Sequence, residues 1–292
     1  MVEVGVVHEL LREQHPDLAA LPISRVPGGW DNELWRIGDD LAVRLPRSAA
    51  AETLLRREQE WLPRLARTLP LPAPVPIREG VSTPMFSRPW TVARWVPGEP
   101  ADRSPVRTRS SAGLLATFLR ELHHAAPPDA PLDPKRGVPL SIMDSEFRER
   151  LAAVSELVDG PRIRQVWDKA VAAPEFTGRP VWLHGDLHPA NVVTIEGSLA
   201  GVIDFGCLCA GDPATDLAAA WTILPPGWSA EFFTAYGGID QAMMWRARGW
   251  TVLLGLALVA IGLAGERGRL GGQPTWLPAG QVALRSCCEE PL

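Results

Sequence analysis

The chain has 292 residues, which is enough to bury a sizeable core and long for one compact domain, so two lobes are expected. Its formal net charge of −5 implies no general affinity for nucleic acid or other polyanions. The four cysteines form no C-x-x-C pair and no cluster at zinc-ligand spacing, and no secretory signal opens the sequence, so a reduced, cytoplasmic protein is expected.

The first third of the chain predicts a small sheet accompanied by two helices. Residues 4–15 place apolar side chains at helical spacing, and this helix is expected to end before Pro16. Residues 49–69 predict a second helix with one buried face. The predicted strands are short and cover residues 23–26, 34–37, 41–45, 85–87 and 90–96. A Pro-Gly-Glu-Pro run at 97–100 then interrupts the chain.

The remainder of the chain is predicted to be mainly helical. The predicted helices cover residues 108–125, 144–157, 163–171, 217–223, 230–236 and 241–264. Residues 192–195 and 199–203 predict a hairpin. The apolar stretch 250–264 has fifteen residues, whereas a membrane span needs about twenty, so a buried core helix and no membrane contact are predicted. The Gly- and Pro-rich tail from Gly265 predicts a mobile or partly disordered end.

Together these elements predict an α+β protein. Residues 1–97 would form a small N-lobe around an antiparallel sheet, and residues 98–292 would form a larger, mainly helical C-lobe. No internal repeat is evident.

Two short runs carry the strongest functional signal: HGDLHPAN at residues 184–191 and IDFG at residues 203–206. The catalytic loop of a protein kinase has the pattern H-R-D-x-x-x-x-N and is followed by D-F-G. Its Asp accepts the hydroxyl proton, while its Asn and the D-F-G Asp hold Mg²⁺. The order and spacing of the polar residues here therefore indicate phosphoryl transfer.

The polar residues match this pattern. The one departure is Gly185, which stands where the kinase loop has Arg. Asp186 and Asn191 lie five residues apart and can occupy opposite ends of one short loop, and the predicted hairpin would bring Asn191 and Asp204 side by side. The alternative is that each Asp-Gly or Gly-Asp pair only marks a turn.

These two runs, with GDPATDLA at residues 211–218, resemble the aminoglycoside phosphotransferase family, whose members look like distant relatives of protein kinases. The similarity is dense over residues 182–221 and thinner elsewhere. It implies a two-lobed protein-kinase-like fold with the nucleotide between the lobes. It also implies transfer of the γ-phosphate of ATP or GTP, with Mg²⁺, to a hydroxyl of a small molecule, often an antibiotic.

The resemblance also implies roles for single residues. Asp186 would be the catalytic base, and Asn191 and Asp204 would bind Mg²⁺. His184 and Asp216 would support the catalytic loop without touching substrate.

On the nucleotide side, Gly28 and Gly29 let the backbone approach a phosphate, and the family carries a nucleotide-covering loop at this place. The alternative is an ordinary hairpin turn. Arg44 occupies the strand position of the kinase Lys that pairs the phosphates. Arg is a planar fork and not a point charge, although it also contacts phosphate. A solvated charge on the strand is the alternative.

Glu58 lies fourteen residues after Arg44 and suits the helix Glu that orients that cation. Glu52 and Glu60 are its competitors, and Glu58 is favoured because it shares the apolar face of the predicted helix. In the family the adenine lies against the segment that follows the sheet. We therefore expect the base to contact the linker made of Ala93, Arg94, Trp95 and Val96.

The acceptor is specified weakly. Aminoglycosides are polycations, so an acidic pocket is expected, and the acidic candidates are Asp212, Glu231, Asp240 and Glu266. Tryptophans are more prominent in this half of the chain, at Trp221, Trp228, Trp245, Trp250 and Trp276. Most are expected in the core. Two or three in the pocket would indicate a bulkier, more apolar acceptor such as a macrolide.

Two other functions stay open at this point. The acceptor is alternatively a small metabolite, such as an amino alcohol or a sugar. The chain is alternatively a pseudokinase that binds nucleotide without transferring phosphate, for which Arg44 is the main support. The expected partner is a small molecule with a free hydroxyl, and the protein is expected as a monomer or dimer.

Overall fold

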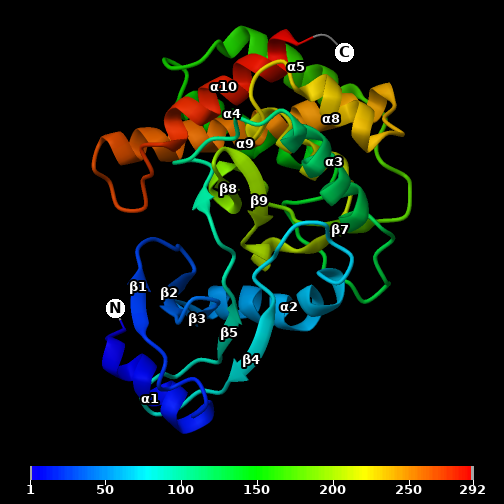
Figure 1. Cartoon of the computed structure of the whole chain (residues 1–292). Helices are drawn as coiled ribbons and strands as arrows, with labels where there is room; N and C mark the ends of the chain where they lie inside the picture. Colours follow the sequence, from blue (N-terminus) through cyan, green and yellow to red (C-terminus); the bar gives the residue numbers. More distant parts are fainter. Residues whose placement is uncertain (1, 291–292) are drawn as a thin grey trace. The chain divides into compact units, whose positions relative to one another are not determined.

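The computed structural model describes residues 2–290, and their contacts divide the chain into two compact units. The first unit comprises residues 2–68, 72–97 and 202–206. The second comprises residues 69–71, 98–201 and 207–290. Figure 1 colours the first unit mainly blue to cyan and the second mainly green to red.

The first unit is built on a five-stranded antiparallel sheet. Its strands are β1 (Ile23–Val26), β2 (Asn32–Ile37), β3 (Leu41–Pro46), β4 (Pro76–Gly80) and β5 (Trp90–Arg94), in the order β1-β2-β3-β5-β4. In the register of the central strands, Arg44 lies opposite Leu34 on one side and Thr91 on the other.

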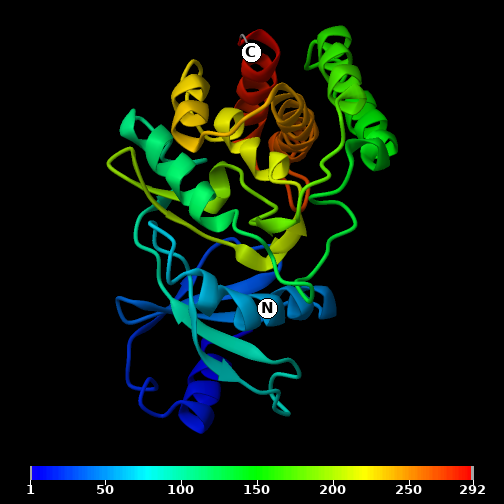
Figure 2. The ribbon, with the colours of Figure 1, turned by 90° about the vertical axis from the view of Figure 1, so that its right-hand side faces the viewer.

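Two helices pack on this sheet, α1 (Val4–Gln14) and α2 (Ala49–Leu65). Because side chains alternate along a strand, Val43 and Leu45 of β3 point to one face. They join the core that Leu10 of α1 also enters. Arg44 points to the other face, against α2. Figure 2 shows α2 lying along the sheet. Strand alternation thus presents a charged side chain to a helix that carries Glu58.

The second unit contains two small sheets. The strands β6 (Glu99–Pro100), β8 (Val192–Ile195) and β9 (Ser198–Val202) form one, in the order β6-β8-β9. The strands β7 (Val181–Leu183) and β10 (Cys209–Gly211) pair antiparallel in the other. The catalytic-loop residues connect β7 to β8, so the two sheets hold the two ends of that loop.

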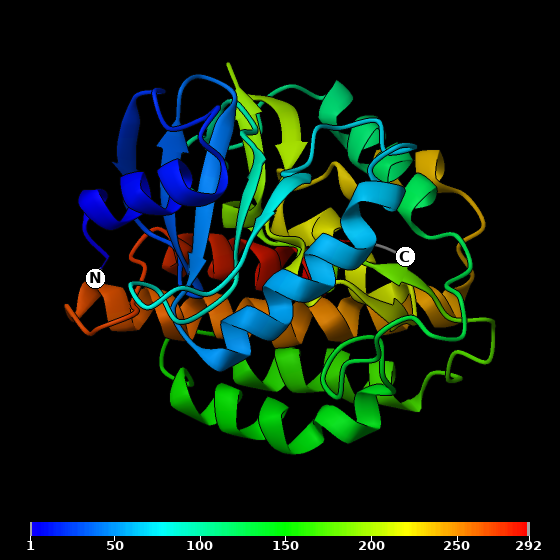
Figure 3. The same ribbon diagram turned by 90° about the horizontal axis from the view of Figure 1, so that it is seen from below.

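Helices make up most of the second unit. They are α3 (Ser110–Leu122), α4 (Asp144–Ala153), α5 (Gly160–Ala172), α6 (Ala214–Leu217), α7 (Ala219–Thr222), α8 (Ser229–Tyr236), α9 (Gln241–Glu266) and α10 (Trp276–Glu289). Figure 3 shows α4 and α5 running along α9, and α10 packs against α9 as well. Helix α9 is thus the centre of the helical packing.

Helix α9 has 26 residues and is long and apolar enough, by length and composition, to cross a membrane. However, 67% of its most apolar window is buried inside the structure, as in the core helix of a soluble protein. Its backbone meets α10 closely, because a Cβ atom at Gly280 would lie 2.7 Å from the carbonyl oxygen of Gly255. Glycine therefore allows these two helices to pack backbone to backbone.

The end of α10 is tied to the elements around it. Arg248 of α9 donates from Nη1 to the carbonyl of Cys287 at 2.5 Å and from Nη2 to that of Glu290 at 2.7 Å. The Glu290 carboxylate accepts from the Gly227 amide at 2.8 Å and the Trp221 indole at 3.0 Å. Residue 290 thus joins α10 to the α7–α8 connection.

Two of the sequence predictions were wrong. Residues 85–87 form no strand, because the Thr83 hydroxyl accepts from the Met85 and Phe86 amides and makes a local turn. The sheet uses β4 at its edge instead, where a leading Pro76 is tolerated. The tail predicted as mobile contains α10, since its glycines permit close packing and Pro278 lies in the first helical turn.

Candidate active site

The loop between β7 and β8 brings Asp186 and Asn191 into contact. The Asn191 side chain is buried, and its Nδ2 group donates to the Asp186 carbonyl at 2.8 Å and approaches the Asp186 Oδ2 atom at 3.4 Å. A short 3-10 turn over Pro189–Asn191 closes the loop before β8 begins. Two of the residues that the motif singled out therefore form one polar group.

Asp216 at the start of the α6–α7 segment supports the backbone of this loop. Its carboxylate is 1% exposed and accepts from the His184 amide at 2.6 Å and the Gly185 amide at 2.8 Å. The His184 imidazole turns back into the loop and accepts from the Asp186 amide at 3.3 Å. The conformation just before Asp186 is thus fixed by a buried carboxylate and a buried imidazole.

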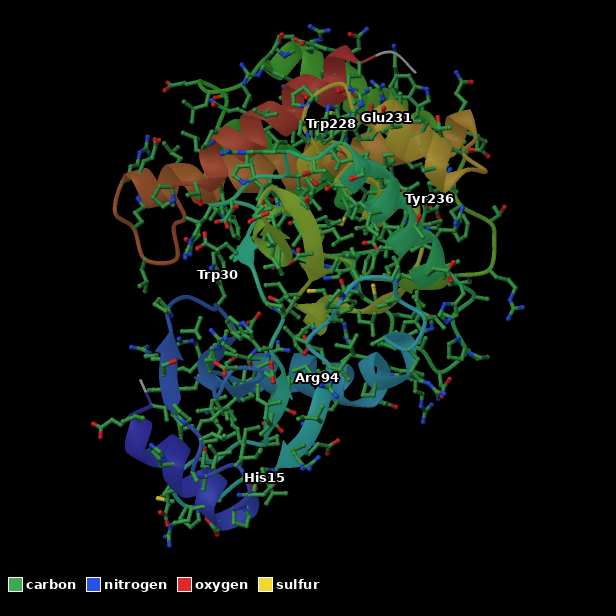
Figure 4. The ribbon with its side chains drawn as sticks, viewed as in Figure 1. His15, Trp30, Arg94, Trp228, Glu231 and Tyr236 are labelled. Carbon is green, nitrogen blue, oxygen red and sulfur yellow. The ribbon has the colours of Figure 1, made fainter. Side chains whose placement is uncertain are left out.

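A further pair of side chains stands behind Asp216. The His123 Nε2 atom lies 3.2 Å from the Asp216 Oδ2 atom, and the His123 Nδ1 atom lies 2.8 Å from the Tyr236 hydroxyl. Burial, with the charges of Asp216 and Asp212, raises the pKa of Tyr236 and keeps its hydroxyl a donor. Tyr236 then donates to Nδ1, and the Nε2–H donates to Asp216. The position of Tyr236 on α8 is marked in Figure 4.

The Asp186 carboxylate is 32% exposed, and each of its two oxygens has a neighbouring side chain. Arg136 donates to Oδ1 at 3.4 Å, and the His188 Nε2 atom lies 3.7 Å from Oδ2. Burial works to raise the pKa of Asp186, but the His188 contact and the Arg136 charge outweigh it and hold that pKa well below its usual range. Asp186 is therefore ionised and oriented.

Arg136 and His188 are site residues that the motif analysis did not select. Arg136 lies in the loop between α3 and α4, and only its charge and its Gly137 neighbour distinguish it in sequence. His188 is inside the motif, at a position that the kinase pattern leaves open. The Trp276 ring at the start of α10 lies 4.6 Å from the His188 ring, centroid to centroid.

Asp204 follows β9 and belongs to the first unit. Its backbone φ of +65° lies in the left-handed region, which is unusual for a residue with a side chain and is typical of functional sites. The side chain is 50% exposed, and its Oδ1 atom lies 3.9 Å from the Arg44 Nη2 atom. The carboxylate is thus open to a ligand on one side and faces a cation on the other.

Arg44 and Glu58 form a buried, two-pronged ion pair. Glu58 has no exposed surface and accepts from both terminal nitrogens of Arg44, with 3.1 Å between Nη2 and Oε1. Burial raises the pKa of Glu58 to about 7 against the opposing Arg44 charge, and the Asp204 carboxylate adds to the rise. The geometry selects Glu58 over Glu52, which pairs with Arg56 at 3.0 Å.

The β1–β2 connection has the backbone that a phosphate-covering loop needs. Gly28 and Gly29 have φ values of +99° and +80°, and a Cβ atom at Gly29 would lie 2.6 Å from the Asn32 carbonyl oxygen. Trp30 beside them is 54% exposed, and Figure 4 labels it on this loop.

Backbone hydrogen bonds already occupy some amides of the linker that was expected to contact the base. The Arg94 amide donates to the Val75 carbonyl at 3.0 Å, and the Trp95 amide donates to the Asp40 carbonyl at 2.7 Å. These two amides are therefore occupied. Among residues 2–290, the Val96 amide has no such backbone acceptor, which distinguishes it from these two amides.

Asn191 and Asp204 each carry an oxygen of the kind that Mg²⁺ prefers. Because Nδ2 of Asn191 faces Asp186, its amide oxygen is directed away from that residue and is open as a ligand. Asp204 offers a half-exposed carboxylate. The described residues contain no cluster of three or more His, Cys, Asp or Glu that could hold a metal. Mg²⁺ in nucleotide sites uses one or two protein oxygens plus phosphate oxygens, so such a cluster is not required.

Most of the acidic residues proposed for the acceptor already have protein partners. Asp212 is buried and lies 2.7 Å from the Arg246 Nε atom, and Glu231 lies 2.6 Å from the Arg109 Nε atom. Asp240 caps α9 by accepting from the Met243 amide at 2.6 Å. Glu266 is exposed at the end of α9.

The tryptophans divide between core and partly exposed positions. Trp221 and Trp250 are buried, so two of the five lie in the core, fewer than the majority that was expected. Trp228, Trp245 and Trp276 are half-buried. Arg109 lies over the Trp228 ring and Lys169 over the Trp245 ring, so cations cover part of these faces.

Comparison with known proteins identifies the family. The model of the phosphotransferase enzyme family, APH, matches residues 22–252. The chain belongs to this family. The match spans both units and includes Arg44, Asp186 and Asp204. The prediction of a phosphotransferase related to the aminoglycoside enzymes is thereby confirmed.

Curated relatives and solved structures agree with this assignment. An aminoglycoside 3'-phosphotransferase of Escherichia coli is 30% identical over 62% of this chain and 68% of its own length. A viomycin phosphotransferase of Streptomyces vinaceus is 30% identical over 63% and 67%. The chain thus spans about two thirds of the length of these relatives.

The solved structures show the same fold. An aminoglycoside phosphotransferase in complex with GDP and kanamycin superposes with a TM-score of 0.67 at 20% identity, over 96% of this chain and 97% of that one. A macrolide 2'-phosphotransferase of Brachybacterium faecium gives 0.62 at 20% identity, over 94% and 98%. The predicted α+β, protein-kinase-like fold is confirmed.

Proposed function

We propose that this phosphotransferase moves the γ-phosphate of ATP or GTP to a hydroxyl group of a small molecule, with an antibiotic of the aminoglycoside or macrolide type as the leading acceptor. The observation that carries the proposal is the contact between Asp186 and Asn191 on a loop fixed by buried Asp216. This arrangement supplies an ionised base next to an oxygen ligand for a metal.

In the transfer step, the acceptor hydroxyl oxygen bonds to the γ-phosphorus while the bond from that phosphorus to the β–γ bridging oxygen breaks. The nucleoside diphosphate leaves, and the hydroxyl proton passes to the Asp186 carboxylate. Asn191 and Asp204 would hold Mg²⁺, which supplies positive charge to the phosphates when bound. Catalysis then rests mainly on positioning and on charge neutralisation.

Three parts of the first unit would bind the nucleotide. The glycine loop at Gly28 and Gly29 would cover the phosphates with backbone amides. Arg44, fixed by Glu58, would contact the phosphates in place of a lysine. The Val96 amide would donate to the base. Complexes of the solved relatives with GDP and ADP support a purine nucleotide as the donor.

The acceptor class follows from two observations. Named relatives act on aminoglycosides, viomycin and macrolides, which supports a hydroxylated antibiotic. In this chain the Asp212 and Glu231 carboxylates are neutralised by arginines. With these two charges neutralised, an acceptor with few positive charges is favoured over a strong polycation. A metabolite acceptor, such as an amino alcohol or a sugar, is the alternative that an acceptor panel separates.

A pseudokinase without transfer activity is the second candidate, and the observation that favours it is Arg44 at the lysine position. Its intact pairing with Glu58 argues against loss of function. Arg44→Lys separates the two cases, since a chain that gains activity from none with this change would be a natural pseudokinase.

A phosphate-transfer assay with purified protein tests the proposal. ATP and GTP, with and without Mg²⁺, are each offered against kanamycin, viomycin, erythromycin and a set of amino alcohols and sugars. We expect Mg²⁺-dependent phosphorylation of at least one antibiotic by a cytoplasmic monomer or dimer. Turnover of metabolites alone would replace the antibiotic assignment, and no turnover with any acceptor would overturn the transferase.

A further inference from the structure

We propose that Arg136 is a positioning residue of the transfer reaction, which supplies from a separate loop the arginine that the HGD motif lacks beside its base. This inference rests on the proposed role of Asp186. Nothing in the H-x-D-x-x-x-x-N pattern selects Arg136, because it lies fifty residues before Asp186.

Arg136 grips two consecutive residues of the catalytic loop. Its Nε atom donates to the Gly185 carbonyl at 2.7 Å, and its Nη2 atom donates to the Asp186 Oδ1 atom at 3.4 Å. Nε and Nη2 lie on one edge of the rigid guanidinium plane, so these two contacts fix the orientation of the carboxylate relative to its own backbone. The other oxygen, Oδ2, faces Asn191 and His188.

Gly185 makes this approach possible. Its φ of +80° is one that glycine adopts without strain. A Cβ atom there would lie 3.0 Å from the Arg136 Cδ atom and 2.7 Å from the Cys207 carbonyl oxygen. The stem of Arg136 therefore fills the space that a side chain at position 185 would need. The glycine in the motif thus leaves the space that the distant arginine occupies.

The loop that carries Arg136 is held firmly on β10 and the turn that follows it. The Ala210 amide donates to the Pro131 carbonyl at 2.8 Å, and the Asp212 amide donates to the Gly137 carbonyl at 3.1 Å. The Gly137 amide donates to the Thr215 hydroxyl at 3.2 Å. These contacts lie on both sides of Arg136, so its backbone is fixed before it reaches the catalytic loop.

Gly137 and Gly211 lie in direct backbone contact beneath this loop. A Cβ atom at Gly211 would lie 2.5 Å from the Gly137 Cα atom. Two glycines on separate segments thus allow an approach that places the preceding Arg136 at the catalytic loop. A surface arginine of no function would not require such packing.

The consequence for the reaction is geometric. A carboxylate that does not rotate meets the acceptor hydroxyl in a single orientation. A misplacement of the reacting groups by 1 Å costs about 100-fold in rate. We therefore expect Arg136→Gln to lower kcat by about 10- to 100-fold while the KM for ATP stays within about twofold. Arg136→Lys should recover little, because a point charge lacks the planar pair of donors.

The experiment compares Arg136→Gln, Arg136→Lys and Arg136→Ala with the wild type, using ATP and whichever panel acceptor the wild type phosphorylates fastest. Arg148→Gln is the matched control, since Arg148 is exposed and pairs with Asp144 on its own helix. Guanidinium at a non-denaturing concentration is then added to Arg136→Ala. A positioning role predicts partial recovery of kcat with guanidinium and none with methylammonium.

Thermal melts recorded on all variants separate folding from positioning. Loss of kcat in a variant that melts like the control, together with guanidinium rescue, supports the proposal. An unimpaired Arg136→Gln enzyme would overturn it while leaving the proposed function intact. A wild-type chain without transferase activity would overturn both.

Discussion

The two units hold their candidate site residues in different ways. In the first unit, Arg44 lies between Glu58 and Asp204, and Glu58 is wholly buried, with its pKa raised to about 7. In the second, Asp186 is oriented by several uncharged and charged donors, and its pKa is lowered. The comparison teaches that Asp186 of the proposed transfer site is held by several contacts, whereas Arg44 of the proposed nucleotide site is held mainly by its pair with Glu58.

The largest effect is expected at the base itself. Asp186→Asn keeps the shape and the contact with Asn191 but removes the proton acceptor, so kcat should fall by about 10² to 10⁴. Binding of Mg-ATP, measured by calorimetry, should be nearly unchanged because Asp186 is not a proposed metal ligand. Turnover close to that of the wild type would remove Asp186 from the mechanism.

The next effect tests how strongly the catalytic loop depends on its support. Asp216→Ala leaves the His184 and Gly185 amides and the His123 imidazole without their acceptor in a buried site. Unsatisfied buried donors cost roughly 1 to 3 kcal/mol each, so the free energy of unfolding should fall by about 3 kcal/mol or more. Urea unfolding measures it. A variant as stable as the wild type would show that the loop holds its shape without Asp216.

The first unit should respond to pH in two opposite directions. Folded Glu58 keeps its proton up to about pH 7, while in the unfolded chain the pKa is near 4.5. The folded state therefore binds more protons between these pH values, and this group lowers the free energy of unfolding as pH rises from 4.5 to 7. Nucleotide affinity should instead rise through pH 7, because ionised Glu58 orients Arg44.

Glu58→Gln should remove both trends at once. Its affinity for ATP at pH 8 should be about tenfold below that of the wild type, as expected for loss of a charge-assisted hydrogen bond, and should vary little with pH. Calorimetry at pH 6 and pH 8, with urea unfolding at the same values, provides the measurement. If wild type and variant had parallel pH profiles, Glu58 would not be the titrating group.

The smallest effect is expected at Tyr236, which contacts the catalytic loop only through His123 and Asp216. Tyr236→Phe removes the hydroxyl that donates to the His123 Nδ1 atom and leaves the ring in place. The loss should be about 1 kcal/mol of stability, with a modest fall in kcat. NMR of the His123 ring nitrogens would report whether the proton stays on Nε2. An unchanged tautomer and an unchanged kcat would show that Tyr236 does not contribute to the support of the catalytic loop.

The sequence predicted much of this molecule because local patterns dominate in it. Strands 23–26 and 192–195 have the predicted limits, and the Arg44–Glu58 pair follows from strand alternation meeting a helix face. Arg136 and His123 were missed because their partners are distant in the chain. No local period records that the loop at Gly137 crosses β10 beside Gly211.

The tail illustrates the same limit from the other side. Pro278 and Gly280 belong to the Gly- and Pro-rich stretch that begins at Gly265, and the prediction of a mobile end followed from that composition. In the folded protein Gly280 lets α10 approach α9 closely, and Pro278 lies in the first turn of α10. Composition alone cannot distinguish a glycine that frees the chain from one that lets two helices touch.

The contacts of Arg248 and Glu290 have a consequence for biosynthesis. The guanidinium of Arg248 on α9 donates to carbonyls about forty residues further along the chain. The Gly227 and Trp221 donors likewise bind the carboxylate of residue 290. During translation, α8 and α9 therefore leave the ribosome before the groups that satisfy them. The face of α9 that packs on α10 therefore stays uncovered until α10 has been made, whereas α4 and α5 precede α9 in the chain.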